Sequence, residues 1–264
     1  MTLFALGPEG TFSHEVACKL VPPGEVQLLP AIGTVLSSVE QGLGEGVIPV
    51  ENSEAGGVGP TLDGLLRYDI FVTAEIYIEV HHFLASFLPI NKVSVIYAHP
   101  QTSEQCSEFL DNLGIEIIPT KSNAASAIEL LANRKGAAVV SRKISEIYDL
   151  PVIASQIENN LHNVTRFFRV SSNPYQESRP EKCSIVVDPA TDRPGLLYEL
   201  LGVFERRGIN LCRIESRPSK RGIGSYVFFM DITTSPGYEE SLAELEGLTT
   251  IKRLGCYKRL EVHP

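Results

Sequence analysis

Short apolar runs alternate with segments of helical periodicity through residues 3–170, and this alternation restricts the fold more than any other feature. The runs that we expect to be strands are Leu3–Leu6, Val26–Leu29, Gly46–Val50, Phe71–Val80, Val93–Tyr97, Glu116–Ile118 and Ala137–Val140. The segments expected to be helices are Ser13–Leu20, Val35–Leu43, Leu62–Tyr68, Thr102–Leu113 and Ala124–Asn133. Strands that alternate with helices need crossover connections, so the pattern predicts an α/β fold with open, mostly parallel sheets.

The longest apolar run extends from Phe71 to Leu84, and a strand of that length can pass from one lobe to another. We therefore expect two α/β lobes joined by two crossings, near Glu79 and near Leu161. One lobe comprises residues 1–78 with 162–178, and the other residues 79–161. Open α/β sheets bind ligands in the crevice at the ends of their strands, so a ligand is expected between the lobes.

A polar stretch with two prolines, Ser171–Pro180, interrupts the pattern and reads as a linker. A second domain, residues 182–264, follows it. Its expected elements are a strand at Cys183–Val187, a helix at Pro194–Arg207, strands at Ile209–Glu215 and Tyr226–Ile232, a helix at Tyr238–Leu245 and a strand at Ile251–Leu260. The order β-α-β-β-α-β is the ferredoxin-like α+β plan. We expect the two parts of the chain to work separately once the linker is cut.

The charge balance weighs against a nucleic-acid partner. The chain of 264 residues has 23 Lys and Arg against 32 Asp and Glu, a net charge of −9, whereas phosphate contacts need concentrated basic residues. An anionic substrate is still compatible with this charge, because one arginine in a cleft acts at short range. No apolar run reaches the roughly 18–20 residues of a membrane helix, and the first residues lack the pattern of a signal peptide. These features predict a cytoplasmic protein.

The residues that bind metals and cofactors show no suitable spacing. The five cysteines are scattered without a C-x-x-C pair, which predicts reduced thiols rather than disulfides or a zinc site. The six histidines form no H-E-x-x-H pattern. The glycines of Gly42–Gly46 precede a predicted strand instead of a helix, which argues against dinucleotide binding. We expect neither a metal nor a cofactor.

Two polar segments follow predicted strands in the first lobe. Gly7–His14 leads into a helix, where Thr11 and Ser13 could bind an anion with the helix N-terminus, or Ser13 could simply cap the helix. Val50–Gly57 presents a run of polar side chains, at a place where α/β proteins bind ligands. The alternative for this second segment is a polar connecting loop.

Two further segments lie near the expected crevice. His99–Cys106 opens a helix from which Gln105 can face the cleft while Cys106 packs inside, although a capped helix with solvated glutamines fits as well. Asn159–Phe168 carries Arg166 into an apolar strand. A guanidinium binds a carboxylate through two parallel hydrogen bonds, which favours a substrate-binding role over that of a surface arginine.

Taken together and in this order, the segments resemble those of the prephenate dehydratases. The resemblance rests on Gly7–Ser13, Val50–Ser53, His99–Cys106 and Asn163–Phe167. The C-terminal part resembles the ACT domain of these enzymes in Gly195–Leu201 and Glu215–Pro218. The chain departs from the family at Ala98, where a serine is frequent, and at Leu196, where the ACT motif has alanine.

The resemblance implies an enzyme of phenylalanine biosynthesis that converts prephenate to phenylpyruvate and is inhibited by L-phenylalanine. It implies a two-lobed catalytic part like that of periplasmic binding proteins, residues 1–178, and an ACT regulatory domain, residues 182–264. It also implies a homodimer or tetramer and no cofactor. Arogenate dehydratase and a non-catalytic amino-acid sensor are the alternatives.

The site residues that the resemblance implies fall into three groups. The catalytic residues are Thr165, Arg166, Asn52 and Glu51. Thr165 is expected to donate a hydrogen bond to the departing oxygen, and Glu51, kept protonated by burial, to hold the proton in reserve. The substrate-binding residues are Thr11, Phe12, Ser13, Ser53, Gln105, Asn163 and Phe167. The residues for phenylalanine are Gly195, Leu196, Leu197, Asn210, Leu211, Glu215, Ser216, Arg217 and Pro218.

Overall fold

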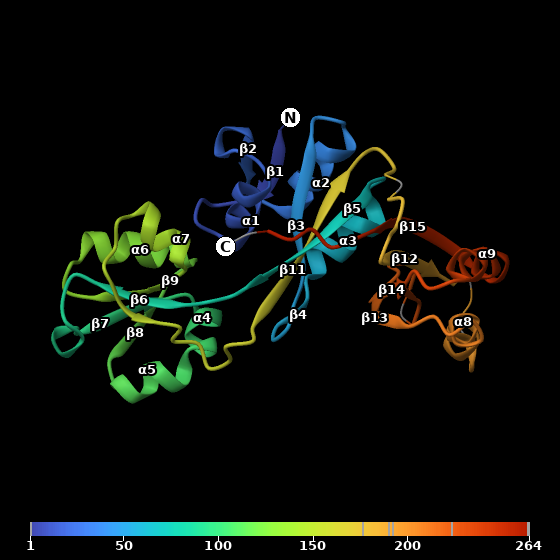
Figure 1. Cartoon of the computed structure of the whole chain (residues 1–264). Helices are drawn as coiled ribbons and strands as arrows, with labels where there is room; N and C mark the ends of the chain where they lie inside the picture. The colour runs from blue at the N-terminus through green and yellow to red at the C-terminus, as the bar shows by residue number, and fades with distance from the viewer. Residues whose placement is uncertain (1, 176, 190, 192, 223, 263–264) are drawn as a thin grey trace.

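A computed structural model of the chain describes residues 2–175, 177–189, 191, 193–222 and 224–262. These residues form two α/β lobes and a C-terminal α+β domain, arranged in a row with the first lobe in the middle (Figure 1). Residues 190, 192, 223, 263 and 264 of the predicted second domain lie outside the described residues. No helix in the described ranges combines the length and apolar character needed to cross a membrane.

The first lobe is built on one mixed sheet of order β2-β1-β3-β11-β5. Its strands are β1 (Leu3–Leu6), β2 (Val26–Leu29), β3 (Glu45–Asn52), β5 (Phe71–Glu79) and β11 (Val164–Ser171), with the short β4 (Gly56–Gly57) beside β3. Strands β1, β2 and β3 are parallel, as predicted, whereas β11 runs antiparallel to both of its neighbours. Helix α1 (Phe12–Leu20) covers one face, and α2 (Ile32–Glu40) and α3 (Gly59–Arg67) cover the other.

The second lobe has a mixed sheet of order β10-β6-β9-β7-β8. Its strands are β6 (Phe83–Ser86), β7 (Val95–Ala98), β8 (Glu116–Pro119), β9 (Ala137–Val140) and β10 (Val152–Ser155). Its helices are α4 (Pro100–Gln105), α5 (Ser107–Leu113), α6 (Asn123–Ala132) and α7 (Arg142–Ile147). The short 3-10 turns Pro23–Glu25 and Ile90–Lys92 complete the two lobes.

Two crossings join the lobes, close to the predicted places. The expected single strand through Leu84 is broken instead, since β5 ends at Glu79 and β6 begins at Phe83. Backbone N–H groups in residues 80–82 tie the crossings together: Val80 donates to the carbonyl of Asn163 (2.8 Å) and His82 to the Glu158 carboxylate (2.8 Å).

The C-terminal domain has the predicted β-α-β-β-α-β order. Its sheet runs β13-β14-β12-β15, and its strands are β12 (Lys182–Asp188), β13 (Leu211–Pro218), β14 (Tyr226–Thr233) and β15 (Thr250–Tyr257). Helices α8 (Leu196–Glu205) and α9 (Tyr238–Leu248) cover one face of this sheet. Figure 1 shows the opposite face turned toward the first lobe.

The first lobe and the C-terminal domain share a hydrophobic core. Five buried side chains of the C-terminal sheet belong to the same cluster as Phe168 and Val170 of β11, namely Val186, Val227, Phe229, Leu254 and Tyr257. The tail after β15 also returns to the first lobe, where the N–H of Leu260 donates to the carbonyl of Glu75 (2.8 Å). The tail residues 258–262 therefore pack with the first lobe, and cutting the linker would expose a shared core. The expected separation of the two parts does not fit this packing.

The cysteines differ from the prediction in one pair. Cys183 of β12 and Cys256 of β15 face each other in register, with their Cα atoms 4.0 Å apart, and form a disulfide. The expectation of five reduced thiols is wrong for this pair, because antiparallel pairing joins residues 73 positions apart. Cys18, Cys106 and Cys212 are free.

Candidate active site

The start of β11 places Thr165 beside Asn52, the last residue of β3. The two residues are partners in the antiparallel ladder, and Ile78 of β5 flanks Thr165 on its other side. Successive side chains of a strand point to opposite faces of the sheet. Thr165 therefore faces the α1 side, where Ile78 and Phe167 pack, and Arg166 faces the other side.

Asn52 fixes the direction of the Thr165 hydroxyl. Its Nδ2 donates to Thr165 Oγ1 (3.0 Å) and to Asn163 Oδ1 (2.6 Å). Its Oδ1 accepts from the backbone N–H groups of Glu54 (3.0 Å) and Ala55 (2.9 Å), which prevents the amide from turning over. A hydroxyl that accepts from Asn52 keeps its own hydrogen to donate elsewhere. Thr165 is thus left with a hydrogen for a ligand.

Asn163 is fully buried behind this pair and is held from both sides. Its Nδ2 donates to Glu54 Oε2 (3.1 Å), and its Oδ1 accepts from Asn52. Ser53 contributes mainly to the chain path, since its N–H donates to the carbonyl of Val164 (2.9 Å) and its Oγ accepts from the N–H of Val164 (3.0 Å). Glu54 was not among the predicted site residues, and only the folded position of Asn163 identifies it.

The start of α1 resolves the two readings of the glycine-rich segment. Thr11 is the N-cap: its Oγ1 accepts from the N–H of His14 (3.3 Å) and donates to the carbonyl of Leu6 (3.1 Å). The cap is Thr11 rather than Ser13, which is buried. Phe12 extends toward the second lobe and meets the ring of His82 edge-on, with the centroids 6.1 Å apart. The expectation that Ser13 caps the helix is therefore wrong, because Thr11 takes that position.

The second lobe contributes Gln105, at the end of α4. Its Oε1 accepts from Nε2 of His82 (3.1 Å), and its backbone carbonyl accepts from the N–H of Asn159 (2.7 Å). His82 is 1% exposed, and its Nδ1 has no hydrogen-bond partner among the described residues. Burial lowers the pKa of His82, so its imidazole is neutral with a free acceptor. This histidine was not among the predicted site residues. Cys106 packs inside, as expected, and burial raises its pKa to about 12.

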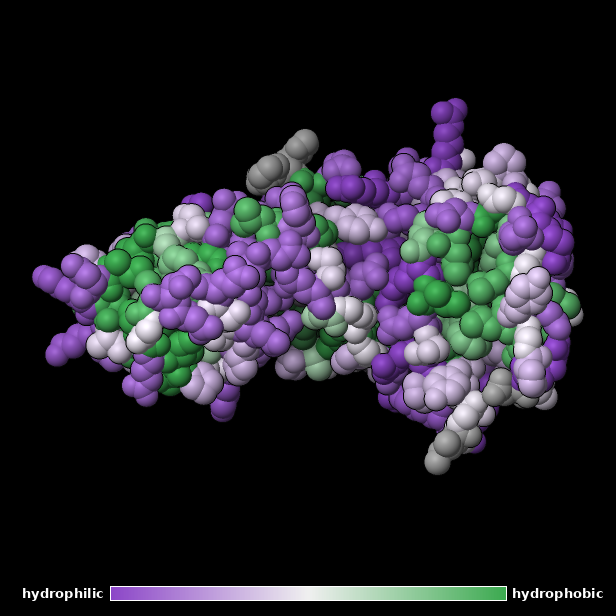
Figure 2. Space-filling view, turned by 90° about the horizontal axis from the view of Figure 1, so that it is seen from below, coloured by the Kyte–Doolittle hydropathy of each residue, from purple (hydrophilic) through white to green (hydrophobic). Residues whose placement is uncertain are grey.

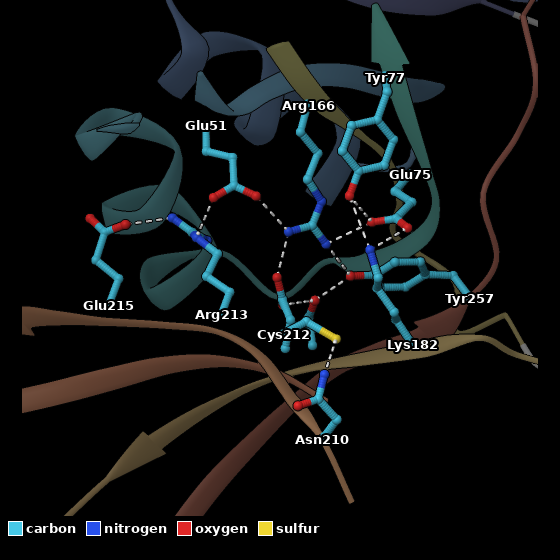
Figure 3. A network of polar contacts seen from close by, with 12 residues as sticks. Glu51, Glu75, Tyr77, Arg166, Lys182, Asn210, Cys212, Arg213, Glu215 and Tyr257 are labelled. Carbon is cyan, nitrogen blue, oxygen red and sulfur yellow. Dashed lines mark hydrogen bonds and ion pairs between the residues drawn. The ribbon is translucent and has the colours of Figure 1, made fainter. Parts of the chain in front are cut away.

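Arg166 lies on the opposite face, in the polar network of Figure 3. Its guanidinium contacts Glu51 (2.9 Å), Glu75 (2.8 Å), Asp231 (2.5 Å) and the hydroxyl of Tyr257 (3.0 Å). Burial alone would lower its pKa, but Asp231, Tyr257 and Glu75 raise it, so Arg166 stays charged. The prediction that Arg166 binds a substrate carboxylate is corrected, because carboxylates of the protein already surround it.

Glu51 belongs to the same network. One of its oxygens pairs with Arg166 and the other with Nε of Arg213 (2.8 Å), a residue of β13. Both of its carboxylate oxygens are thus bound by guanidinium groups of the protein. Alternation along β3 also turns Glu51 away from the face that Asn52 shares with Thr165. The prediction that Glu51 holds a proton in reserve for the departing oxygen is therefore corrected, because its carboxylate lies on the opposite face of the sheet.

The residues expected to bind an effector divide between the two faces of the C-terminal sheet. Gly195 is the N-cap of α8 with a φ of 82°, a conformation that favours glycine, and nothing lies within 4 Å of an added Cβ. Asn210 is exposed just before β13. Three apolar members pack on the helix side of the sheet: Leu196, Leu197 and Leu211.

The charged members of this set have other partners. Glu215 pairs with Arg213 (2.5 Å), and Arg217 pairs with Asp63 of the first lobe (3.0 Å). Ser216 and Pro218 point the other way and are exposed. The expected effector role of Glu215 and Arg217 is corrected, because alternation along β13 turns them toward the first lobe.

Within the described ranges, no group of three or more His, Cys, Asp or Glu side chains is placed to hold a metal ion. The polar groups around Thr165 include the amides of Asn52 and Asn163, with the Glu54 carboxylate behind Asn163. Amides and hydroxyls can donate hydrogen bonds to a ligand.

Comparison with known proteins identifies two regions. Residues 3–175 match the model of the family "Prephenate dehydratase", and residues 185–249 match that of the "ACT domain". A bifunctional chorismate mutase/prephenate dehydratase of Stutzerimonas stutzeri is 37% identical over 232 residues, which cover 86% of this chain and 63% of that protein. A prephenate dehydratase of Methanocaldococcus jannaschii is 34% identical over 262 residues, 95% of each chain. The solved prephenate dehydratase of Arthrobacter aurescens in complex with L-Phe superimposes with a TM-score of 0.87 at 29% identity, covering 100% of this chain and 94% of that one.

Proposed function

The chain belongs to the prephenate dehydratase family, and from this premise we propose that it converts prephenate to phenylpyruvate in phenylalanine biosynthesis. The observation that carries the proposal is the hydrogen bond from Asn52 Nδ2 to Thr165 Oγ1 (3.0 Å). It leaves the hydrogen of the Thr165 hydroxyl free to reach a substrate oxygen. Prephenate has such an oxygen in the ring hydroxyl that must leave.

The reaction removes a carboxylate as CO2 and the ring hydroxyl as hydroxide, which takes up a proton from the solvent to become water. The electron pair of the broken carbon–carboxylate bond moves into the ring, and the hydroxyl departs with its bonding pair. Aromatisation drives the reaction, so the protein mainly has to stabilise the departing oxygen. Thr165 donates to that oxygen, and one preorganised donor of this kind supplies about 2.7–4 kcal/mol.

We assign substrate binding to neutral groups rather than to Arg166. Phe12 packs against the substrate ring, while Ser13, Gln105 and the buried His82 offer hydrogen bonds. The hydrogen bond between His82 and Gln105 (3.1 Å) supports this assignment. It joins the crossing segment to helix α4 of the second lobe, and the His82 ring also contacts Phe12 of the first lobe, so the three side chains meet between the lobes. His82 Nδ1 is then an acceptor for the substrate or for a bound water.

Phenylalanine regulates the enzyme through the ACT domain. The Arthrobacter protein, 29% identical, is a complex with L-Phe, which supports phenylalanine as the ligand here. The exposed turn at Gly195 offers backbone groups for the amino acid's charged ends, and Leu196 and Leu211 offer apolar contacts for its ring.

A homodimer or tetramer is the assembly that we propose. Figure 2 shows apolar residues gathered over part of the C-terminal domain. Large apolar side chains of this domain are exposed to 82% at Tyr198, 47% at Tyr226 and 41% at Ile214. Pairing of two such domains would bury them, which sedimentation of the purified protein would detect.

The test of the function is direct. Purified protein is incubated with prephenate, and the absorbance of phenylpyruvate is followed; a parallel assay with arogenate distinguishes the aminated substrate. No product from either substrate would leave a non-catalytic amino-acid sensor as the remaining interpretation.

The cytoplasmic location stays a prediction, and the Cys183–Cys256 disulfide argues against it, since such bonds are rare in the cytoplasm. Blocking free thiols inside intact cells and then counting the blocked cysteines would show whether Cys183 and Cys256 are reduced or joined there.

A further inference from the structure

A buried ionic cluster joins the catalytic sheet to the ACT domain, and we call it the Arg166 cluster. It consists of Arg166, Glu51, Glu75, Asp231 and Tyr257 (Figure 3). Arg166, Glu75 and Asp231 are 3%, 2% and 3% exposed, so the charges are removed from water. A buried pair of this kind is held rigidly, because loss of one partner leaves an unpaired charge in the interior.

Every strand of the ACT sheet contributes a side chain to this cluster or to its partners. Asp231 comes from β14 and Tyr257 from β15. Ser184 of β12 donates to Asp231 (2.5 Å) and is hydrogen-bonded to Tyr257. Arg213 of β13 pairs with Glu51 (2.8 Å). A change in the strand arrangement of the ACT domain would therefore reach the guanidinium of Arg166.

On the catalytic side the cluster ends one residue from the active site. Arg166 and Glu51 are direct ladder partners of β11 and β3, and the next pair along the ladder is Thr165 with Asn52. The register of the two strands shifts immediately after Arg166. The ion pair between Arg166 and Glu51 is thus the cross-link between β11 and β3 that lies directly beside Thr165 and Asn52, between this pair and the register shift.

We infer that Asp231 is a positioning residue of the ACT domain that sets the Thr165–Asn52 contact through Arg166, and that phenylalanine inhibits along this route. The inference rests on the proposed function. Asp231 touches no substrate. It acts by holding the Nη1 atom that also holds Glu51, so a displaced Asp231 changes the pairing of β3 with β11. Coupling between the ACT domain and the active site needs a structural element that can adopt two arrangements, and we assign that part to the Arg166 cluster.

The test compares Asp231→Asn with a control at a second contact between the same parts. Asn keeps the size of Asp but removes its charge. The control is Asp63→Asn, which breaks the ion pairs of Asp63 with Arg217 and Lys220 at the exposed edge of the contact. Full-length proteins are compared for kcat and KM with prephenate, for inhibition by phenylalanine, for phenylalanine affinity by calorimetry and for melting temperature.

We expect Asp231→Asn to lower kcat about tenfold, an effect of about 1.4 kcal/mol, with little change in KM. Phenylalanine should still bind to this variant, but should inhibit it much less completely than the wild type. The Asp63→Asn enzyme should match the wild type in kcat and inhibition. This split separates positioning from simple destabilisation, which would lower the active fraction and leave the inhibition of the remainder unchanged.

Two results overturn the inference: a wild-type kcat in Asp231→Asn, or a lowered kcat with undiminished inhibition. If Asp231→Asn does not fold, Tyr257→Phe removes only the hydroxyl that Arg166 contacts and must show the same loss of inhibition. Failure of the proposed function is distinguishable, because the wild-type chain would then form no phenylpyruvate at all.

Discussion

Replacement of Asn52 by Asp tests the catalytic geometry with the smallest change in shape. The Asp side chain keeps the oxygen that accepts from the N–H groups of Glu54 (3.0 Å) and Ala55 (2.9 Å), so the turn after β3 should survive. It loses the donor that Asn52 directs to Thr165 Oγ1 (3.0 Å) and to Asn163 Oδ1 (2.6 Å). A carboxylate oxygen now faces the hydroxyl.

The carboxylate reverses the hydrogen bond. It can only accept, so the Thr165 hydroxyl turns its hydrogen toward Asp and away from the substrate. The departing oxygen then lacks its donor, which costs about 2.7–4 kcal/mol, or about 10²–10³ in kcat. Thr165→Ala removes the same donor and should lose a similar factor.

Steady-state kinetics on Asn52→Asp, Thr165→Ala and the double variant complete the test. Because both changes remove one interaction, the double variant should be no slower than Thr165→Ala alone. A kcat that falls further by another factor of about 10² would show that Asn52 acts independently of Thr165. An Asn52→Asp enzyme with altered KM and unaltered kcat would refute the hydroxyl's role as a donor to the leaving group.

Four further outcomes are expected. Thr165→Ser should keep most of the kcat, because the hydroxyl remains; a loss as large as that of Thr165→Ala would contradict this. Turnover should survive exhaustive chelation, and loss in EDTA with recovery on one divalent ion would argue for a metal. A chain ending at Arg179 should be insoluble, or should melt at least about 10 °C below the full-length protein, since it exposes the core that the first lobe shares with the C-terminal domain. A truncated chain that is stable and active would contradict that packing. Burial opposes the protonation of His81, but Glu158 and Glu79 raise its pKa. Its stabilising contact is therefore complete below pH 6.5 and is lost as the pH rises through the raised value, and melting curves of His81→Asn at different pH values should lack this pH dependence.

The elements that the sequence predicted well are those whose signals are local. Leu3–Leu6, Val26–Leu29 and Ala137–Val140 agree with the strands β1, β2 and β9, because short apolar runs between polar turns define their own ends. The β-α-β-β-α-β order of the C-terminal part was also predictable from periodicity and breakers. Strands β6, β10 and β11 were not separated in advance, since their ends depend on the crossings and on neighbours distant in sequence.

The site residues were harder to predict, because the sequence motif does not specify sheet faces. Asn52 and Thr165 lie together as the motif suggests, and their contact comes from pairing across more than 100 residues. Arg166 and Glu51 are adjacent to them in the chain but face the ACT domain. His82 shows no motif of its own, and only its burial beside Gln105 marks it.

The same alternation affects how losses of activity at Arg166 should be read. A variant such as Arg166→Lys would reduce activity without any contact to prephenate, because an ammonium cannot hold Glu51, Glu75 and Asp231 in the planar arrangement of a guanidinium. Kinetics on that variant alone would therefore resemble the loss of a catalytic residue. Its sensitivity to phenylalanine carries the distinction, since a substrate-binding arginine leaves regulation intact and a coupling arginine does not. Because Thr165 and Arg166 are neighbours on one strand, their side chains lie on opposite faces of the sheet, and we propose catalysis for the α1 side and communication with the ACT domain for the other.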